Sequence, residues 1–349
     1  MRISISTIPV ILLSCLSVLC VPIWASRGDQ LAEFKECVRF CIEQNCIYDP
    51  TPLPLHLRLL LWTCPTECDY SCQRTVTQLR LESVPQKPIE QFHGKWPFRR
   101  VLGIQEPFSV IFSLANLYAH VYGLESLKRE VPRSYPLYGY YRLFGYMGLV
   151  CWFWSAVFHT RDFRFTERMD YFAAGANVMY GLFLAPVKVW KWYLPSSTSS
   201  APSAFREKAT ISGATSTPTP LRLHLWALVC FSLYAAHVYY LTCVRWSYTY
   251  NMAANVVIGA LTNLIWSYFA IRHYSRLKQL WAATPGLIVT WLVLAMSLEL
   301  LDFPPLWGAI DAHSLWHAAT VAPTVMWYGF LIRDAKREVE GDEGVRRVD

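Results

Sequence analysis

Charged residues are scarce in this sequence. Asp, Glu, Lys and Arg make up 16% of its 349 residues, whereas ordinary soluble domains carry about 25%. No soluble segment has a basic stripe with interleaved aromatic side chains, which argues against nucleic-acid binding. The sequon Asn-x-Ser/Thr is also absent, so N-glycosylation is not expected. This shortage of charge excludes an ordinary soluble domain.

Apolar residues are correspondingly abundant. They make up 54% of the chain, with 15 Trp, 20 Tyr and 18 Phe. Many gather in blocks of about 20 residues, the length of a helix that crosses a bilayer. The blocks predict an all-α membrane protein with a seven-transmembrane helix bundle in residues 107–333. The expected spans are 107–123, 138–158, 170–190, 221–243, 251–271, 279–300 and 313–332.

Residues 1–25 have the pattern of a secretory signal peptide. Arg2 supplies a short positive region, residues 8–23 are apolar, and Trp24-Ala25-Ser26 offers a small-residue exit. An uncleaved first span is the alternative interpretation. Both place the residues after Ser26 in the lumen or outside the cell.

A Cys-rich luminal domain is expected over residues 26–106. Two sets of three cysteines flank a Pro-rich connector: Cys37, Cys41, Cys46 and Cys64, Cys68, Cys72. Their spacing lines up the thiols along two short helices, which predicts three disulfides. Six cysteines can pair in many ways, and the sequence does not choose among them. A zinc-binding cluster is the competing interpretation, but an oxidising compartment favours disulfides.

The loops predict the orientation of the spans. Loops that would be cytosolic carry many more Lys and Arg than those that would be luminal, in accord with the positive-inside rule. The N-terminal domain is therefore expected in the lumen and the C-terminus in the cytosol. Residues 195–220, rich in Ser, Thr, Pro and Ala, predict a disordered cytosolic linker. Residues 334–349 predict a charged cytosolic tail.

Ionisable residues gather at the predicted luminal ends of three spans. Ser155 and His159 share a helix face, Asp170 opens the next span, and His313 and His317 share a face near the chain's end. Such residues are costly in a membrane without a function or a partner. Three neutral imidazoles suit zinc, leaving a fourth position for water. The pattern predicts a hydrolase acting on something in the luminal leaflet.

Two other interpretations compete with the zinc site. A histidine at a helix end is often only an interfacial residue. A nucleophilic triad of Ser155, His159 and Asp170 is also conceivable. It employs one histidine and leaves the segment HSLWH without a role, so the metal site is preferred.

Several segments carry a resemblance to a known family. They are CVRFC, QFHGKWPF, QEPFSV with FSLAN, FWSAVFHTRD, RMDYF, YNMAANVVIG and LELLDFPPLWGAIDAHSLWH. The SxxxH, Asp and HxxxH pattern resembles the seven-span CREST membrane hydrolase superfamily. The segments together resemble, more narrowly, the Per-type GPI-anchor lipid-remodelling family. The likeness covers nearly the whole mature chain except residues 195–220 and the tail.

The resemblance implies a zinc-dependent GPI phospholipase A2. Such an enzyme removes the sn-2 acyl chain from the inositol phospholipid of GPI-anchored proteins. The family's zinc ligands would fall on His159, His313 and His317, with Ser155 and Asp170 supporting the water and the intermediate. Family members work in the endoplasmic reticulum membrane of fungi and the Golgi of animals, so the former is expected here and the latter is the alternative.

Further residues and functions remain open. Arg161, Arg164 and Arg168 oppose the positive-inside trend and could contact the anchor's phosphate, or form a solvated loop. The sequence also offers acceptors for ligand histidines, or loop caps: Glu299, Asp302 and Asp311. The alternative functions are a ceramidase-like amidase, a non-enzymatic receptor or metal-homeostasis factor, and a chaperone of GPI proteins.

Overall fold

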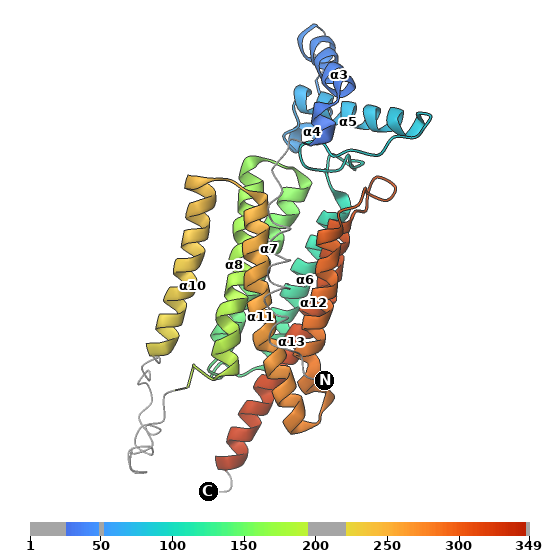
Figure 1. Ribbon diagram of the computed structural model, residues 1–349. Helices are drawn as coiled ribbons and strands as arrows, with labels where there is room; N and C mark the ends of the chain where they lie inside the picture. The colour runs from blue at the N-terminus through green and yellow to red at the C-terminus, as the bar shows by residue number, and fades with distance from the viewer. Residues whose placement is uncertain (1–25, 49–51, 195–220, 347–349) are drawn as a thin grey trace, which may run out of the picture. The chain divides into compact units, whose positions relative to one another are not determined.

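The structure is a computed structural model that describes residues 26–48, 52–194 and 221–346. Within these ranges the chain is helical, and no strand is present. The helices are α2 (Arg27–Gln30), α3 (Ala32–Ile42), α4 (Leu55–Leu59), α5 (Cys64–Glu82), α6 (Pro107–Glu130), α7 (Tyr138–Thr160), α8 (Arg164–Val189), α10 (Leu221–Tyr239), α11 (Tyr248–Leu277), α12 (Thr284–Leu301) and α13 (Ala312–Arg346) (Figure 1). Shorter helical turns cover Glu43–Tyr48, Tyr240–Val244 and Leu280–Ala283.

The chain divides into two compact units. The first contains the residues up to Ala115 together with Trp154–Arg168 and Ala295–Ala319. The second contains Asn116–Phe153, Met169–Leu294 and the residues from Thr320 onwards. The boundaries fall inside helices, so one helix can contribute residues to both units.

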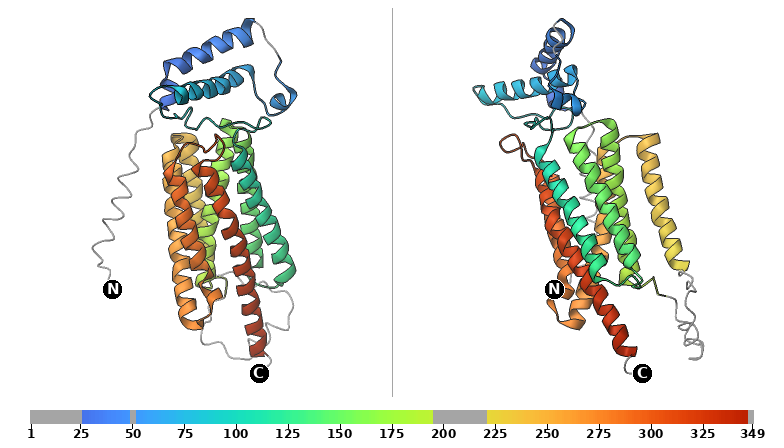
Figure 2. Two further views of the ribbon diagram at one scale, coloured as in Figure 1. Left: turned by 90° about the vertical axis from the view of Figure 1, so that its right-hand side faces the viewer. Right: turned by 180° about the vertical axis from the view of Figure 1, so that it is seen from behind.

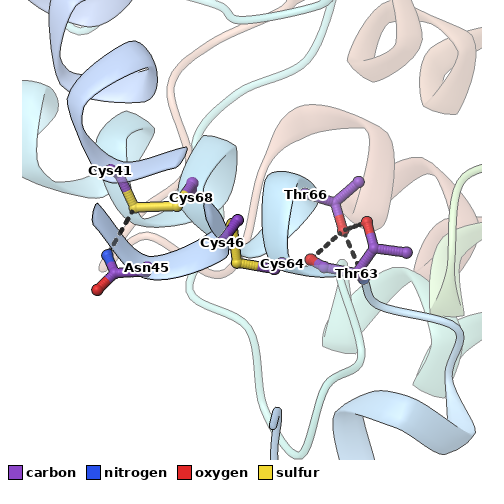
Figure 3. Close-up of a disulfide and its surroundings, with 7 residues drawn as sticks. All are labelled: Cys41, Asn45, Cys46, Thr63, Cys64, Thr66 and Cys68. Atoms are coloured by element: carbon purple, nitrogen blue, oxygen red, sulfur yellow. Dashed lines mark hydrogen bonds between the residues drawn. A yellow bond between two sulfur atoms is a disulfide. The ribbon is translucent and has the colours of Figure 1, made fainter. Parts of the chain in front are cut away.

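Disulfides join α3 and the turn after it to α5 in the first unit. The pairs are Cys37–Cys72, Cys41–Cys68 and Cys46–Cys64. This nested order requires antiparallel segments, and Figure 2 shows α3 and α5 side by side. Thr63 and Thr66 cap the start of α5, where the backbone N–H of Thr63 donates to Thr66 Oγ1 at 2.9 Å (Figure 3). The predicted disulfides are confirmed, and the pairing that the sequence left open is now known.

The segment between α5 and α6 connects the disulfide region to the C-terminal end of α7. Phe92 packs against Phe34 with ring centroids 4.7 Å apart, beside the Cys37–Cys72 bridge. Arg100 ion-pairs with Glu67 at 2.6 Å and fixes the segment to α5. The backbone N–H of Glu106 then donates to the carbonyl oxygen of His159 at 3.0 Å. Glu106 is thereby placed beside the last turn of α7.

Helix α8 lies between α7 and α10 in the second unit (Figure 1). The Tyr180 hydroxyl on α8 donates to the carbonyl oxygen of Tyr140 on α7 at 2.8 Å. Trp226 Nε1 on α10 donates to the carbonyl oxygen of Phe183 on α8 at 3.1 Å. The buried core of this unit is rich in leucine and aromatic side chains, among them Leu127, Leu137, Tyr141, Leu184, Trp266, Phe330 and Leu331.

Five helical segments of the described residues are long and apolar enough to cross a membrane. They are Tyr138–Thr160, Arg164–Val189, Leu221–Val244, Tyr248–Leu277 and Leu280–Leu301. Helices α6 and α13 form over the expected first and last spans, but they do not qualify by length and composition. Each carries polar side chains such as Ser113 and His317, which lower its apolar character. A multi-span membrane protein is supported, while the count of seven spans is not confirmed.

Some expectations lie outside the described residues. They are the signal peptide at 1–25, the linker at 195–220 and the end of the tail from residue 347. The domain boundaries proposed from the sequence also remain predictions.

Candidate metal centre

Three histidines converge in the first unit. His159 lies in the last turn of α7, and His313 and His317 lie one turn apart at the start of α13. Their Nε2 atoms face one another, at 3.3 Å between His159 and His313 and 3.0 Å between His313 and His317. One ligand atom from each ring lies within 4.8 Å of the other two. Residues 154 positions apart in the sequence thus form one cluster.

The outer nitrogen of each ring has its own partner. His159 Nδ1 lies 2.8 Å from Glu106 Oε2, and His313 Nδ1 lies 2.6 Å from Glu299 Oε2. An ionised carboxylate only accepts hydrogen bonds, so these Nδ1 atoms carry the hydrogen and leave the lone pair on Nε2. His317 Nδ1 lies 3.0 Å from Ser113 Oγ, a hydroxyl that can accept in the same way. All three rings can therefore turn a lone pair inward.

This donor set fits a zinc ion. Three inward lone pairs at 3.0–3.3 Å repel one another unless a proton or a cation lies between them. A tetrahedral zinc with bonds of about 2.0–2.1 Å to imidazole places neighbouring nitrogens about 3.3 Å apart. Carboxylates on the outer nitrogens are the usual partners of metal-binding histidines. The second group of potential ligands, Cys46, Cys64 and Cys68, is already committed to disulfides.

The centre is buried except on one side. Only 2% of His159 and 4% of His317 are exposed, whereas the His313 side chain is 37% exposed. His313 is therefore the most accessible of the three rings.

Ser155 joins the centre through another serine. Its hydroxyl lies 3.0 Å from Ser113 Oγ, the atom that also contacts His317 Nδ1. Both nitrogens of His159 contact other partners, Glu106 and His313, so the geometry does not favour a Ser155–His159 nucleophilic pair. Asp170 belongs to the second unit. Its supporting role remains a prediction.

Lys95 extends the site into the Cys-rich region. Its Nζ lies 2.6 Å from Glu106 Oε1 and 3.0 Å from Asp162 Oδ2, and 4.0 Å from the centroid of the Phe158 ring. Burial opposes its charge, but Glu106 and Asp162 raise the pKa of Lys95 above its usual value. Burial likewise opposes the charge of Glu106, yet Lys95 and His159 hold its pKa well below the usual range. Glu106 thus uses one oxygen for the lysine and the other for the imidazole.

The three arginines after α7 differ in their surroundings. The Arg161 guanidinium lies over the rings of Trp62 and Phe163, at 4.0 Å and 4.5 Å from their centroids. Arg164 and Arg168 are exposed. A phosphate could reach these two more freely than Arg161.

The acidic residues near α13 divide into two groups. Glu299 contacts Nδ1 of the candidate ligand His313 at 2.6 Å, as one of the two sequence interpretations predicts. Asp302 instead accepts from Trp96 Nε1 at 2.7 Å, and Asp311 accepts from the backbone N–H of Ser314 at 2.8 Å as the cap of α13. The sequence patterns did not point to three residues of the centre: Lys95, Glu106 and Ser113. All three lie in segments that carry the family resemblance, QFHGKWPF, QEPFSV and FSLAN, and that was their available signal.

The fold and site together define a multi-span membrane protein with a candidate triple-histidine metal centre. A family model described as Per1-like family matches residues 54–335. The "Protein PER1 homolog" of Schizosaccharomyces pombe is 36% identical over 315 residues, which cover 88% of this chain and 87% of that protein. The "GPI-specific phospholipase A2-like PGAP3" of Cricetulus griseus is 36% identical over 332 residues, and that of Homo sapiens 34% over 330 residues, each covering 93% of this chain and 94% of the relative. The chain belongs to the Per1-like family.

Proposed function

We propose that this chain is a zinc-dependent acyl hydrolase that remodels GPI anchors. It removes the sn-2 acyl chain from the inositol phospholipid of GPI-anchored proteins, in the luminal leaflet of the endoplasmic reticulum membrane or, alternatively, the Golgi. The observation that carries the chemistry is the convergence of three imidazole Nε2 atoms. The substrate rests on the names of the relatives, which describe GPI-specific phospholipase A2-like proteins.

The residues of the centre divide the work. His159, His313 and His317 hold the metal, which when bound polarises an ester carbonyl and activates water at neutral pH. Glu106 and Glu299 fix the orientation and tautomer of two of these rings.

Ser113 and Ser155 lie on the buried side of the centre. Ser113 fixes the His317 ring and leaves Ser155 as a hydroxyl that can orient water or a substrate oxygen. Asp170 is proposed to support the same water, as the family resemblance implies.

The role of Lys95 is to keep Glu106 ionised and in place. Glu106 is 3% exposed, and an isolated carboxylate at such a place is costly. Lys95 balances that charge without contacting the histidines, so Glu106 can remain ionised and keep the hydrogen on His159 Nδ1. Lys95 is a positioning residue in this scheme.

The anchor's phosphate is assigned to the arginines after α7. Arg164 and Arg168 are exposed, while Arg161 is stacked on aromatic rings, so the first two are the main candidates. The charge-removing changes Arg164→Gln and Arg168→Gln should each weaken remodelling through KM. If both variants and Arg161→Gln remodel GPI proteins like the unaltered chain, the phosphate contact is wrong.

One experiment tests the proposal. Full-length chains with His317→Ala, or with His56→Ala as a matched control at an exposed position of α4, are expressed in cells that lack the endogenous activity. Lipid mass spectrometry of GPI-anchored proteins should show unsaturated diacyl anchors accumulating with His317→Ala only. Metal analysis of the purified proteins should show loss of zinc in the same variant.

The same experiment separates the alternatives. A receptor or a chaperone of GPI proteins would leave anchor lipids unchanged when His317 is lost and the protein still folds and traffics. A ceramidase-like amidase would release sphingoid base instead of the acyl chain of the anchor. Either result overturns the proposal.

A further inference from the structure

A cavity lies in the second unit, and its residues differ from those of the histidine cluster. Its volume is about 580 Å³. It is lined by the C-terminal ends of α8 and α11, by the turn Leu280–Ala283 that precedes α12, and by the C-terminal half of α13. No role at the proposed hydrolase centre uses any of its residues.

The acidic residues of this cavity are already neutralised. Lys188, with 1% of its side chain exposed, ion-pairs with Asp334 and lies 3.0 Å from Glu338. Lys191 ion-pairs with the other oxygen of Glu338 at 3.2 Å. Two lysines and two carboxylates therefore balance one another on one wall.

Cations dominate the rest of the lining. Arg272, Arg276 and Arg337 face the cavity, and none of them forms an ion pair with any carboxylate whose side chain the structure describes. Arg272 Nη1 donates to the Tyr268 hydroxyl at 2.8 Å, which leaves its other donors available. Arginine presents several donors in a planar fork that matches the oxygens of a phosphate.

Aromatic side chains complete the cavity. The Arg337 guanidinium lies 4.4 Å from the centroid of the Trp281 ring, and Tyr268 and Phe269 form part of the α11 wall. A ligand held here meets both cations and aromatic rings. That combination suits a charged group attached to an apolar body.

The position of the cavity selects the kind of ligand. Both α8 and α11 are candidate membrane spans, and the cavity lies where they end. The distribution of Lys and Arg predicts that this end faces the cytosol. Basic pockets between spans on the cytoplasmic side are suited to anionic lipid headgroups.

We propose that this cavity binds the phosphate headgroup of an anionic phospholipid from the cytosolic leaflet. Arg276 and Arg337 would contact the phosphate oxygens, with the acyl chains lying along the apolar surface of the spans. The proposal is independent of the hydrolase chemistry, since its residues and its ligand differ from those of the histidine centre.

Native mass spectrometry of the purified full-length chain in detergent tests this site. The probes are phosphatidic acid, phosphatidylcholine and glycerol 3-phosphate. The unaltered chain should retain phosphatidic acid about 10-fold better than phosphatidylcholine, because each nearby cation adds to the attraction for anionic lipid. The double variant Arg276→Gln/Arg337→Gln should lose that preference. Equal melting temperatures of variant and parent establish that folding is intact, and Arg272→Gln serves where the double variant does not fold.

The control is Lys128→Gln/Arg133→Gln, which removes the same charge from exposed positions outside the cavity on the same predicted side. It should keep the preference for phosphatidic acid. Loss of the preference in the control would mean that net charge alone attracts lipid, and its persistence in Arg276→Gln/Arg337→Gln would mean that the cavity plays no part. Displacement of phosphatidic acid by an equal concentration of glycerol 3-phosphate would assign the cavity to a soluble anion. Each of these outcomes overturns the proposal.

Discussion

Two lysines, one in each unit, are held in the same way and serve different ends. Lys95 lies between Glu106 and Asp162, and Lys188 lies between Asp334 and Glu338. The Lys95 side chain is 25% exposed, whereas that of Lys188 is 1% exposed. A lysine between two carboxylates is therefore not by itself a sign of function.

The difference lies in the other partners of the carboxylates. Glu106 turns its second oxygen to a ring of the histidine centre, at 2.8 Å from His159 Nδ1. Glu338 instead accepts from the hydroxyls of Tyr135 and Tyr193, at 2.8 Å and 3.0 Å. The first cluster orients a candidate metal ligand, whereas the second contacts two tyrosine hydroxyls and Lys191 and joins the end of α8 to α13. The comparison teaches that the neighbour of an ion pair decides its role.

The largest expected effect is on stability, from Lys188→Met. The change leaves the buried Asp334 and the partly buried Glu338 without their shared counter-charge, which costs about 3–5 kcal/mol. Denaturant unfolding in detergent measures this loss, and zinc content per folded molecule should be unchanged. Lys336→Met is the control, because the Lys336–Glu130 pair is partly exposed and should contribute only about 0–1 kcal/mol. Equal losses of unfolding free energy in both variants would contradict the expected difference between a buried and a partly exposed ion pair.

The next effect is on the metal, from Glu106→Gln. Loss of the carboxylate removes the ionised acceptor of His159 Nδ1, and metal affinity and hydrolysis should each fall about 10–100-fold. Zinc titration by competition with a chelator measures the first quantity. Glu90→Gln is the matched control, since Glu90 is also buried and ion-pairs with Arg80 at 3.0 Å without contacting a histidine. If Glu106→Gln bound zinc like the parent, the Lys95 cluster would have no more influence on the metal than the Lys188 cluster.

A smaller effect is expected from Tyr135→Phe. The hydroxyl donates to Glu338 and receives a hydrogen bond from Lys188 Nζ at 3.3 Å, so its loss should cost about 1–3 kcal/mol of unfolding free energy. Zinc content should not change. Tyr118→Phe, at an exposed position of α6, should leave the unfolding free energy within about 0.5 kcal/mol of the parent.

The smallest effect concerns pH. A hydrogen bond to Asp69 raises the pKa of His93 above its ordinary value of 6.5, although burial opposes the shift. A raised pKa stabilises the folded state fully below the unfolded value, and that stabilisation is lost as pH rises through the folded value. Lys95 and Glu106, with their pKa values shifted outward, keep their charges across this range.

The melting temperature of the parent should therefore fall slightly between about pH 6 and pH 8, and His93→Asn should reduce that fall. A steeper dependence in His93→Asn would assign the titration to another group.

Spacing predicted the elements of the site that repeat along a helix. Three or four residues separate neighbouring cysteines within each set, and three separate His313 from His317, so the sequence alone lines up each set along a helical segment. The disulfide pairing could not be predicted, because it depends on the relative direction of α3 and α5.

Other members of the site left little trace in the sequence. Glu106 stands one residue before α6 and belongs to no periodic pattern, and its role arises only because its backbone N–H joins the end of α7. Ser113 is one of several polar residues of α6, among them Ser109 and Asn116, and helix packing is the usual explanation for such residues. Polar residues such as Ser113 in α6 and His317 in α13 also make these two helices less apolar than the spans expected there.

The turn that joins Phe92 to Lys95 connects the disulfide region to the candidate metal centre. Phe92 is anchored among side chains held by the Cys37–Cys72 bridge, and three residues later Lys95 braces the carboxylate behind His159. A newly made chain with reduced thiols would lack the anchor that keeps this brace in place. The orientation of His159 would then depend on oxidation of these thiols, and a reducing environment would weaken it.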